Sequence, residues 1–169
     1  MLGRYWESVG VSGNQMLLTG TFPRTIDEKQ RIAIPKRLRD AFQQTAETQA
    51  VIYVAPGTDG SLTLYTEESF SQLAKQLSAS PQTGQDVRAF SRLFYSQAQR
   101  IELDRQGRLR IPPELVELAG LAKEVVLVGV RDHLELWDRQ GWQTYVLEKQ
   151  NNYDRLAENA FMPPNRKES

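Results

Sequence analysis

The stretch Ile26-Asp27-Glu28-Lys29-Gln30-Arg31-Ile32-Ala33-Ile34-Pro35 aligns without gaps on Leu103-Asp104-Arg105-Gln106-Gly107-Arg108-Leu109-Arg110-Ile111-Pro112, 77 residues further along the chain. The match continues past this motif, because Leu38, Ala41 and Phe42 fall on Leu115, Leu118 and Ala119. Apolar residues at i, i+3 and i+4 form one face of a helix, and a proline just before them suits the first helical turn. Each copy therefore predicts a strand, a tight turn, a second strand and a helix, and Gly120 is expected to end the second helix.

Two further strands are predicted in each copy. Val51-Ile52-Tyr53-Val54 and Leu62-Thr63-Leu64-Tyr65 correspond to Val125-Val126-Leu127-Val128 and Leu134-Glu135-Leu136-Trp137, with loops of different length between them. A strand set this small cannot bury its own apolar face. We therefore expect the two repeats to pack together in one α+β fold.

The repeat divides the chain into five segments. We expect residues 1–15 to be a disordered N-terminal extension, and residues 16–66 and 99–138 to be two β-rich half-domains. Residues 67–98 are predicted to form connecting helices, over Glu67–Ala79 and Asp86–Ala98, on either side of a polar break. Residues 139–169 are predicted to form one long helix from Arg139 to about Asn159, followed by a loose polar tail. These helices are expected to make contacts between the repeats or between copies of the chain.

Composition excludes several classes of protein. The chain has 169 residues, 21 basic and 21 acidic side chains, one histidine (His133) and no cysteine. No apolar run approaches the roughly 18–20 residues that span a bilayer, and no secretory signal is recognisable, so we expect a cytoplasmic protein. A single histidine removes most acid–base and metal chemistry, so we expect no enzyme, metal, cofactor or small-molecule substrate. We interpret His133 as a surface or capped side chain, and Trp137 and Trp142 as core or interface anchors.

The motif shared by the two repeats is an Asp-x-x-x-Arg turn. An aspartate that opens a turn can accept hydrogen bonds from the next backbone N–H groups, so Asp27 and Asp104 are predicted to shape their turns. Arg31 and Arg108 then leave the turns, and a guanidinium suits bidentate contact with guanine O6 and N7 or with phosphate. The alternative is a surface ion pair that closes a hairpin, worth about 0–1 kcal/mol. Duplication of the motif around different loop residues favours the DNA-binding interpretation.

Basic residues gather around both turns although the whole chain is neutral. Six basic and two acidic residues lie between Arg24 and Arg39, a net charge of +4, and four basic and two acidic residues lie between Arg100 and Arg110, a net charge of +2. Binding through such local charge should weaken steeply with added salt. The candidate DNA-binding residues are Arg24, Lys29, Arg31, Arg105, Arg108 and Arg110. Lys36, Arg37 and Arg39 stay open between DNA contact and a solvated helix face.

From about Met16 to Asn159 the chain resembles the MraZ family, the double-repeat members of the AbrB superfamily of swapped hairpins. The resemblance rests on the two ten-residue motifs, on Ala119-Gly120-Leu121-Ala122-Lys123-Glu124-Val125-Val126-Leu127-Val128-Gly129 and on Leu134-Glu135-Leu136-Trp137. It implies two swapped-hairpin, AbrB-like half-domains in a pseudo-two-fold unit that assembles into a homo-oligomeric ring. It also implies a nucleoid-associated regulator that binds short direct repeats in the promoter of the division and cell-wall gene cluster, including its own gene, and represses it. Arg31 and Arg108 occupy the family's DNA-contacting positions, with Lys29 and Arg105 as neighbours on the same loops.

The first turn departs from the family pattern. Gln30 stands where the family, and Gly107 in the second turn, has glycine. If this position needs a positive φ, Gln30 introduces strain of about 1 kcal/mol. We therefore treat Gly107 as turn-shaping and expect the two turns to differ.

The alternative function is an oligomeric protein-interaction scaffold or an antitoxin-like partner protein.

Overall fold

A computed structural model describes residues 17–43, 47–81 and 83–162 of the chain. The N-terminal extension at residues 1–15 and the tail at residues 163–169 lie outside the described residues. The first repeat contains β1 (Thr21–Thr25), β2 (Arg31–Ala33), α1 (Lys36–Arg39), η1 (Asp40–Phe42), β3 (Val51–Pro56) and β4 (Leu62–Tyr65). The second repeat contains β5 (Gln99–Glu102), β6 (Arg108–Arg110), α4 (Pro113–Leu118), β7 (Glu124–Val130) and β8 (His133–Asp138). The connecting helices are α2 (Glu67–Ala79) and α3 (Gln85–Gln97), and the C-terminal helices are α5 (Arg139–Gln150) and α6 (Tyr153–Phe161).

The two repeats exchange their first strands within one six-stranded antiparallel sheet. Its strand order is β1-β7-β8-β4-β3-β5, so β1 of the first repeat pairs with β7 of the second, and β5 of the second pairs with β3 of the first. Replacing each strand by its repeat counterpart reverses this order, which places a pseudo-two-fold axis between β4 and β8. The prediction of an α+β fold with two swapped-hairpin halves is confirmed.

A two-stranded ribbon continues the exchange above the sheet. Strand β2 pairs with β6, and Ile32 stands opposite its own repeat counterpart, Leu109, so the pseudo-two-fold axis passes through this pair. Both side chains are fully buried in the main apolar core, together with Leu38 and Leu115 from the helices that follow. The ribbon is thus held by its inward face, and its other face is left for solvent.

Hydrogen bonds across the axis repeat in the two halves. The Ile26 amide donates to the Lys123 carbonyl at 2.8 Å, and the Leu103 amide donates to the Ala50 carbonyl at 2.9 Å. In the sheet, Thr25 faces Glu124 while Glu102 faces Val51. Val51 is therefore the counterpart of Glu124, so the predicted match of Val51 with Val125 was wrong by one residue. The corrected register places buried Ile52 on buried Val125.

The helices that follow the two motifs end differently. The predicted helical face at the first motif is present, with Leu38 and Phe42 buried, but α1 lasts one turn and continues as the 3₁₀ turn η1. In the second repeat, Gly120 has φ 57° and follows the last residues of α4. The Gly120 amide donates to the Glu117 carbonyl and the Leu121 amide donates to the Val116 carbonyl, both at 3.0 Å. These are the two bonds of a Schellman motif, as the prediction of a glycine cap requires.

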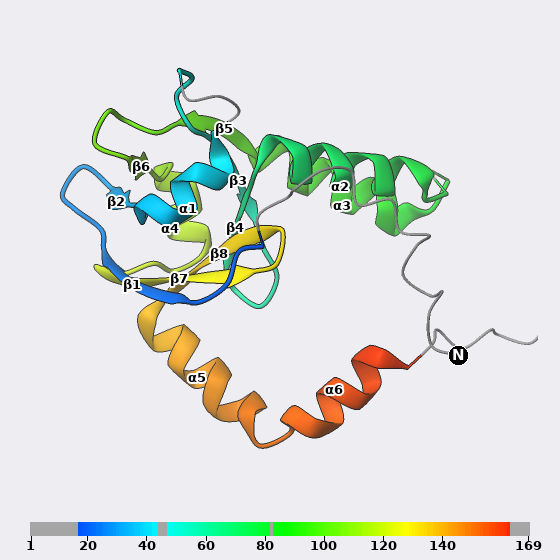
Figure 1. The fold of residues 1–169 in the computed structure, drawn as a ribbon. Helices are drawn as coiled ribbons and strands as arrows, with labels where there is room; N and C mark the ends of the chain where they lie inside the picture. The colour runs from blue at the N-terminus through cyan, green and yellow to red at the C-terminus, as the bar shows by residue number, and fades with distance from the viewer. Residues whose placement is uncertain (1–16, 44–46, 82, 163–169) are drawn as a thin grey trace, which may run out of the picture.

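Two helical arms leave the β-rich body. Helices α2 and α3 lie side by side and project from one side, and α5 and α6 extend below the body with a bend between them (Figure 1). The predicted single helix from Arg139 to about Asn159 was wrong, because α5 ends at Gln150 and α6 begins at Tyr153. Two adjacent asparagines, Asn151 and Asn152, explain the break, since asparagine side chains compete with the helical hydrogen bonds. In the part of the chain that the structure describes, no helix has the length and apolar character that a bilayer crossing requires.

Candidate nucleic-acid interface

The first Asp-x-x-x-Arg turn is organised around one carboxylate. Asp27 Oδ1 accepts hydrogen bonds from the backbone amides of Lys29 and Arg31, both at 2.9 Å, and Asp27 Oδ2 accepts from Arg31 Nε at 2.8 Å. The Gln30 amide closes the turn by donating to the Asp27 carbonyl at 2.9 Å. One side chain therefore fixes both the path of the loop and the direction of the arginine that leaves it.

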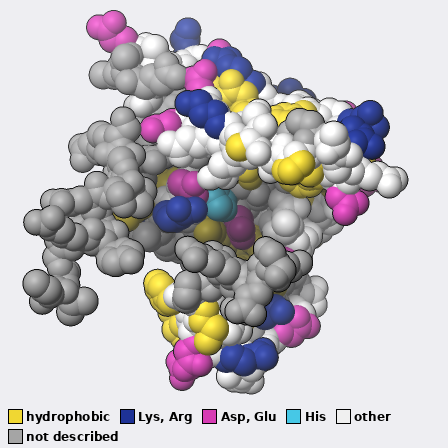
Figure 2. Space-filling model, turned by 90° about the vertical axis from the view of Figure 1, so that its right-hand side faces the viewer, with side chains coloured by type: hydrophobic (Ala, Val, Ile, Leu, Met, Phe, Trp, Pro, Cys, Tyr) yellow, Lys and Arg dark blue, Asp and Glu magenta, His cyan; other side chains and the backbone are white. Residues whose placement is uncertain are grey.

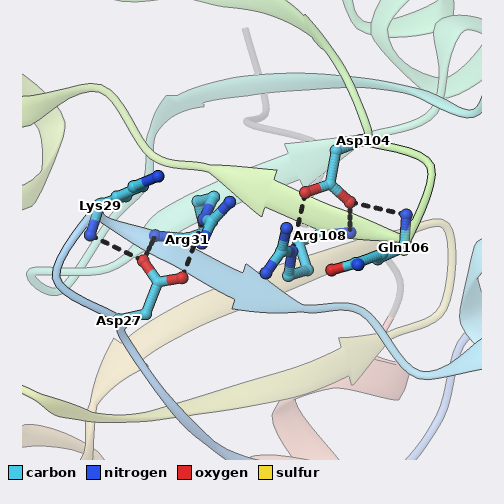
Figure 3. A network of polar contacts seen from close by, with 6 residues as sticks. All are labelled: Asp27, Lys29, Arg31, Asp104, Gln106 and Arg108. Atoms are coloured by element: carbon cyan, nitrogen blue, oxygen red, sulfur yellow. Dashed lines mark hydrogen bonds and ion pairs between the residues drawn. The ribbon is translucent and has the colours of Figure 1, made fainter.

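The second turn has the same geometry with different residues at its tip. Asp104 Oδ1 accepts from the amides of Gln106 at 2.9 Å and Arg108 at 3.0 Å, and Asp104 Oδ2 accepts from Arg108 Nε at 2.7 Å. Figure 3 shows the two turns at opposite ends of the β2–β6 ribbon, with Arg31 and Arg108 on its strands. The duplicated motif thus produces one local structure twice.

Hydrogen bonding keeps both carboxylates ionised. The amide of Arg31 lowers the pKa of Asp27, and the amide of Arg108 lowers the pKa of Asp104, each helped by the Nε bond of the same arginine. Partial burial opposes the shift in both cases. An ionised carboxylate can accept all three hydrogen bonds at once, so the turns are stable at neutral pH.

The third position after each aspartate adopts a left-handed backbone. Gln30 has φ 60° and Gly107 has φ 75°. Position 30 therefore does adopt a positive φ, and a non-glycine residue occupies a position that favours glycine. Its cost is on the order of 1 kcal/mol. The first loop nevertheless keeps the backbone shape of the second.

The solvent-facing side of the ribbon is basic. In the β2–β6 pairing, Arg31 stands opposite Arg110 and Ala33 stands opposite Arg108. Because Ile32 and Leu109 are buried and side chains alternate along a strand, Arg31, Arg108 and Arg110 share the outer face. Like charges directly opposite each other destabilise a strand pair, so this face is built at a cost in stability. An anionic partner would remove that cost.

Arg31 and Arg108 are held at one end and free at the other. Their side chains are 24% and 30% exposed, and each is tied to its aspartate through Nε alone. Among the described residues, their Nη groups have no hydrogen-bond partner. A guanidinium fixed in this way presents its terminal N–H groups in one orientation, which favours bidentate recognition.

The other predicted contact residues surround this face. Lys29 and Arg105 are exposed at the tips of the two loops, and Arg110 is exposed on the ribbon. Arg24 is tied to the ribbon edge, because its Nε donates to the Ala33 carbonyl and its Nη1 to the Pro23 carbonyl, both at 2.8 Å. Arg24 therefore braces β1 against β2 and is a weaker candidate for direct contact.

The tryptophans and the histidine lie in other parts of the fold. Trp137 is buried against Val126 and Val128 and packs on Trp142 and Tyr145, so it anchors α5 as predicted. His133 is half-buried, and its Nδ1 lies 2.8 Å from Asp132 Oδ1. The Glu135 carboxylate, with Oε1 3.7 Å from His133 Nε2, raises the pKa of His133, burial opposes this, and Asp132 adds to it. His133 is thus a capped side chain, which is one of the two interpretations offered from the sequence.

Comparison with known proteins assigns the chain to a family. The family model of the MraZ protein, whose description adds that it is antitoxin-like, matches twice, over residues 17–93 and 94–162. The chain belongs to the MraZ family. The sequence resemblance is thereby confirmed.

Relatives within the MraZ family carry one name. Three proteins called transcriptional regulator MraZ come from Moorella thermoacetica, Ligilactobacillus salivarius and Thermomicrobium roseum. The first is 39% identical over 142 residues, covering 84% of this chain and 95% of the relative. The second is 37% identical over 143 residues, with 85% and 96% covered, and the third is 40% identical over 126 residues, with 75% and 84% covered. These names describe regulators rather than enzymes, in agreement with the expectation that this chain is no enzyme.

Proposed function

We propose that this MraZ-family chain is a sequence-specific DNA-binding transcriptional regulator that reads DNA with the β2–β6 ribbon and its two flanking loops. The observation that carries the proposal is the pair Arg31 and Arg108, each fixed through Nε with its Nη groups free on one basic face. A two-stranded ribbon fits the major groove of B-DNA, and arginine pairs with guanine O6 and N7. The names of the relatives support the same function.

The finer features of the proposal come from the family resemblance. We propose that the target is a set of short direct repeats in the promoter of the division and cell-wall gene cluster, including the chain's own gene, and that binding represses it. We place the protein in the cytoplasm, associated with the nucleoid. Each loop offers few contacts, so several loops joined in one assembly would gain affinity from a matching series of DNA repeats.

The test compares two double variants with the same loss of charge. Arg31→Ala with Arg108→Ala removes both fixed guanidinium groups, and Arg92→Ala with Arg155→Ala removes two exposed arginines from α3 and α6. Fluorescence anisotropy would use duplex DNA from directly upstream of the chain's own coding sequence and a random duplex of equal length. We expect the ribbon variant to lose the preference for the upstream duplex while keeping the wild-type elution volume, and the helix variant to keep the preference. Wild-type preference retained by the ribbon variant at physiological salt would refute the proposal.

The helical arms support a proposal about assembly. Hydrophobic side chains are exposed on both arms (Figure 2), including Leu93 of α3 at 65% and Tyr153 and Phe161 of α6 at 71% and 90%. We propose that further copies of the chain cover these residues in a ring, as the resemblance implies. Phe161→Ser should reduce the mass measured by light scattering after size-exclusion chromatography. An unchanged mass would contradict this role for α6.

The same exposed residues favour the second candidate, a protein-interaction scaffold or antitoxin-like partner, which the family description also suggests. Its expected result is a stoichiometric complex with a different protein and no retention of DNA. The anisotropy experiment separates the two functions, because a scaffold would show no difference between the upstream and random duplexes.

A further inference from the structure

Arg39, the last residue of α1, lies across the loop of the other repeat. A Cβ atom added to Gly107 would come within 2.6 Å of both Cδ and Cζ of Arg39, and closer still to Nη1. The Arg39 side chain, from a helix of the first repeat, therefore occupies the space that a side chain at position 107 of the second loop would take. A side chain at position 107 would therefore displace Arg39, in addition to the strain of its φ of 75°.

Among the described residues, none pairs with the charge of Arg39 in this position. Its Nε is buried and has no hydrogen-bond partner, and the side chain forms no hydrogen bond or ion pair with any described residue. Arg39 lines a surface cavity of about 240 Å³ together with Arg105, Gln43, Gln49, Asp104 and Gly107. Glu47 lines it as well but lies too far from Arg39 for an ion pair, and Asp104 is already bound to Arg108. A half-buried cation without a counter-ion is costly, and an anion at this cavity would satisfy it.

The pseudo-two-fold axis shows that this arrangement is specific to the second loop. Val116 occupies the position of Arg39 in the second repeat, and Gln30 occupies the position of Gly107 in the first. Val116 and Gln30 line the matching cavity at the first loop. Where the loop carries a side chain, the helix residue is short and apolar; where the loop has glycine, the helix residue is long and charged.

We propose that Arg39 is a DNA-contacting residue that the first repeat supplies to the loop of the second, where it binds a backbone phosphate beside Arg105. The inference rests on the proposed DNA-binding function. Nη1, Cδ and Cζ of Arg39 lie against Gly107 and Nε is buried, so the part of the guanidinium that lines the cavity is left to contact the phosphate, and the loop tip brings Arg105 to the same cavity. The second loop thereby gains a phosphate contact that the first loop, with Val116 at this place, lacks.

The salt dependence of DNA binding tests this inference. Arg39→Met keeps a long unbranched side chain over Gly107 and removes the charge, while Arg37→Met is the matched control on the same helix, since Arg37 contacts Thr19 instead of a loop. One lost phosphate contact lowers the slope of log K against log[salt] by about 0.9 for each loop engaged, or about fivefold in affinity at 0.15 M salt. We expect this change for Arg39→Met on both the upstream and the random duplex, and a wild-type slope for Arg37→Met.

The reciprocal variant transfers the contact to the first loop. Gln30→Gly combined with Val116→Arg reproduces the Gly107 and Arg39 pair there, in a Glu28→Gln background because Glu28 lines this cavity in the place of Arg105 and would pair with the new arginine. We expect a slope steeper than that of Glu28→Gln alone by about 0.9 for each loop engaged. Melting temperatures of all variants show whether each is folded, and the transferred pair keeps the test open if Arg39→Met is unstable.

The outcomes separate this inference from the proposed function. If wild-type protein binds the upstream duplex no more tightly than the random duplex, the proposed function itself is refuted. Wild-type protein that binds DNA while Arg39→Met keeps the wild-type slope would refute only the role of Arg39, and weaker binding at an unchanged slope would reduce Arg39 to a structural support. Inorganic phosphate is the probe for a free-anion site. If phosphate raises the melting temperature of wild type but not of Arg39→Met, while both proteins bind DNA with the same slope of log K against log[salt], the ligand is free phosphate and the inference is wrong.

Discussion

Gly107→Ala tests the packing of Arg39 on the second loop, and its effect on stability follows from three contributions. The left-handed backbone at φ 75° costs an alanine about 1 kcal/mol, while the lower entropy of alanine in the unfolded chain returns about 0.4–1 kcal/mol. The new methyl group must also displace the Arg39 guanidinium, because it would lie within 2.6 Å of Cδ and Cζ. Arg39 is a flexible side chain beside an open cavity and can move aside, so this displacement falls at the lower end of the range for overpacking, about 1 kcal/mol. We expect a net loss of about 1 kcal/mol, or roughly 2–4 °C in melting temperature for a chain of this length.

The assay is thermal unfolding followed by circular dichroism at one fixed protein concentration. Gln30→Ala is the matched control, since residue 30 has the same backbone conformation but already carries a side chain. We expect it to change stability by no more than about 0.5 kcal/mol. Arg39→Val removes the obstructing side chain, so the double variant with Gly107→Ala should recover about 1 kcal/mol relative to additive behaviour. A Gly107→Ala variant as stable as Gln30→Ala, or a double variant that is simply additive, would refute the packing argument.

Three further predictions concern the turns, the histidine and the aromatic anchor. The lowered pKa of Asp27 and Asp104 means that their stabilising contribution is present above about pH 4 and is lost as the pH falls through their folded pKa values. The double variant Asp27→Asn with Asp104→Asn should therefore flatten the dependence of melting temperature on pH between about pH 5 and pH 2. A pH dependence parallel to that of wild type would count against the turn geometry. The pKa of His133 is raised, first by Glu135, so the stability that protonated His133 contributes is present below about pH 6.5 and is lost as the pH rises through its folded pKa. His133→Gln should remove the resulting decline in melting temperature. An unaltered decline would assign the pH dependence to another group. Trp137→Ala should cost about 3–5 kcal/mol in denaturant unfolding, because Trp137 is 5% exposed and anchors α5, and a cost under about 1 kcal/mol would show that this cluster does not hold the helix.

Local features of the fold were predictable because the same sequence motif occurs in both repeats. The turn hydrogen bonds to Asp27 and Asp104, the proline before each helix and the glycine at 120 all depend on residues within a few positions of one another. Short strand-like runs, such as Val51-Ile52-Tyr53-Val54, also identified strands. The exchange of strands between the halves was expected only from the family resemblance, because the spacing within one repeat does not determine which strand each strand pairs with.

Features that depend on contacts distant in the sequence were not predictable. Nothing near Arg39 in the sequence indicates that it packs on Gly107, and nothing near Arg31 indicates that it stands opposite Arg110. The break at Asn151 fell within a periodic pattern that resembled one helix. In the described structure α5 and α6 have no buried residues, so no packing overrides the weak helix propensity of the two asparagines.

A structure of the chain bound to duplex DNA from upstream of its own coding sequence tests the central claim most directly. We expect the β2–β6 ribbon in the major groove, with Nη groups of Arg31 and Arg108 about 2.7–3.2 Å from base edges or phosphate oxygens while each Nε stays bound to its aspartate. DNA seated on the helical arms, with the ribbon in solvent and both arginines far from the duplex, would contradict it.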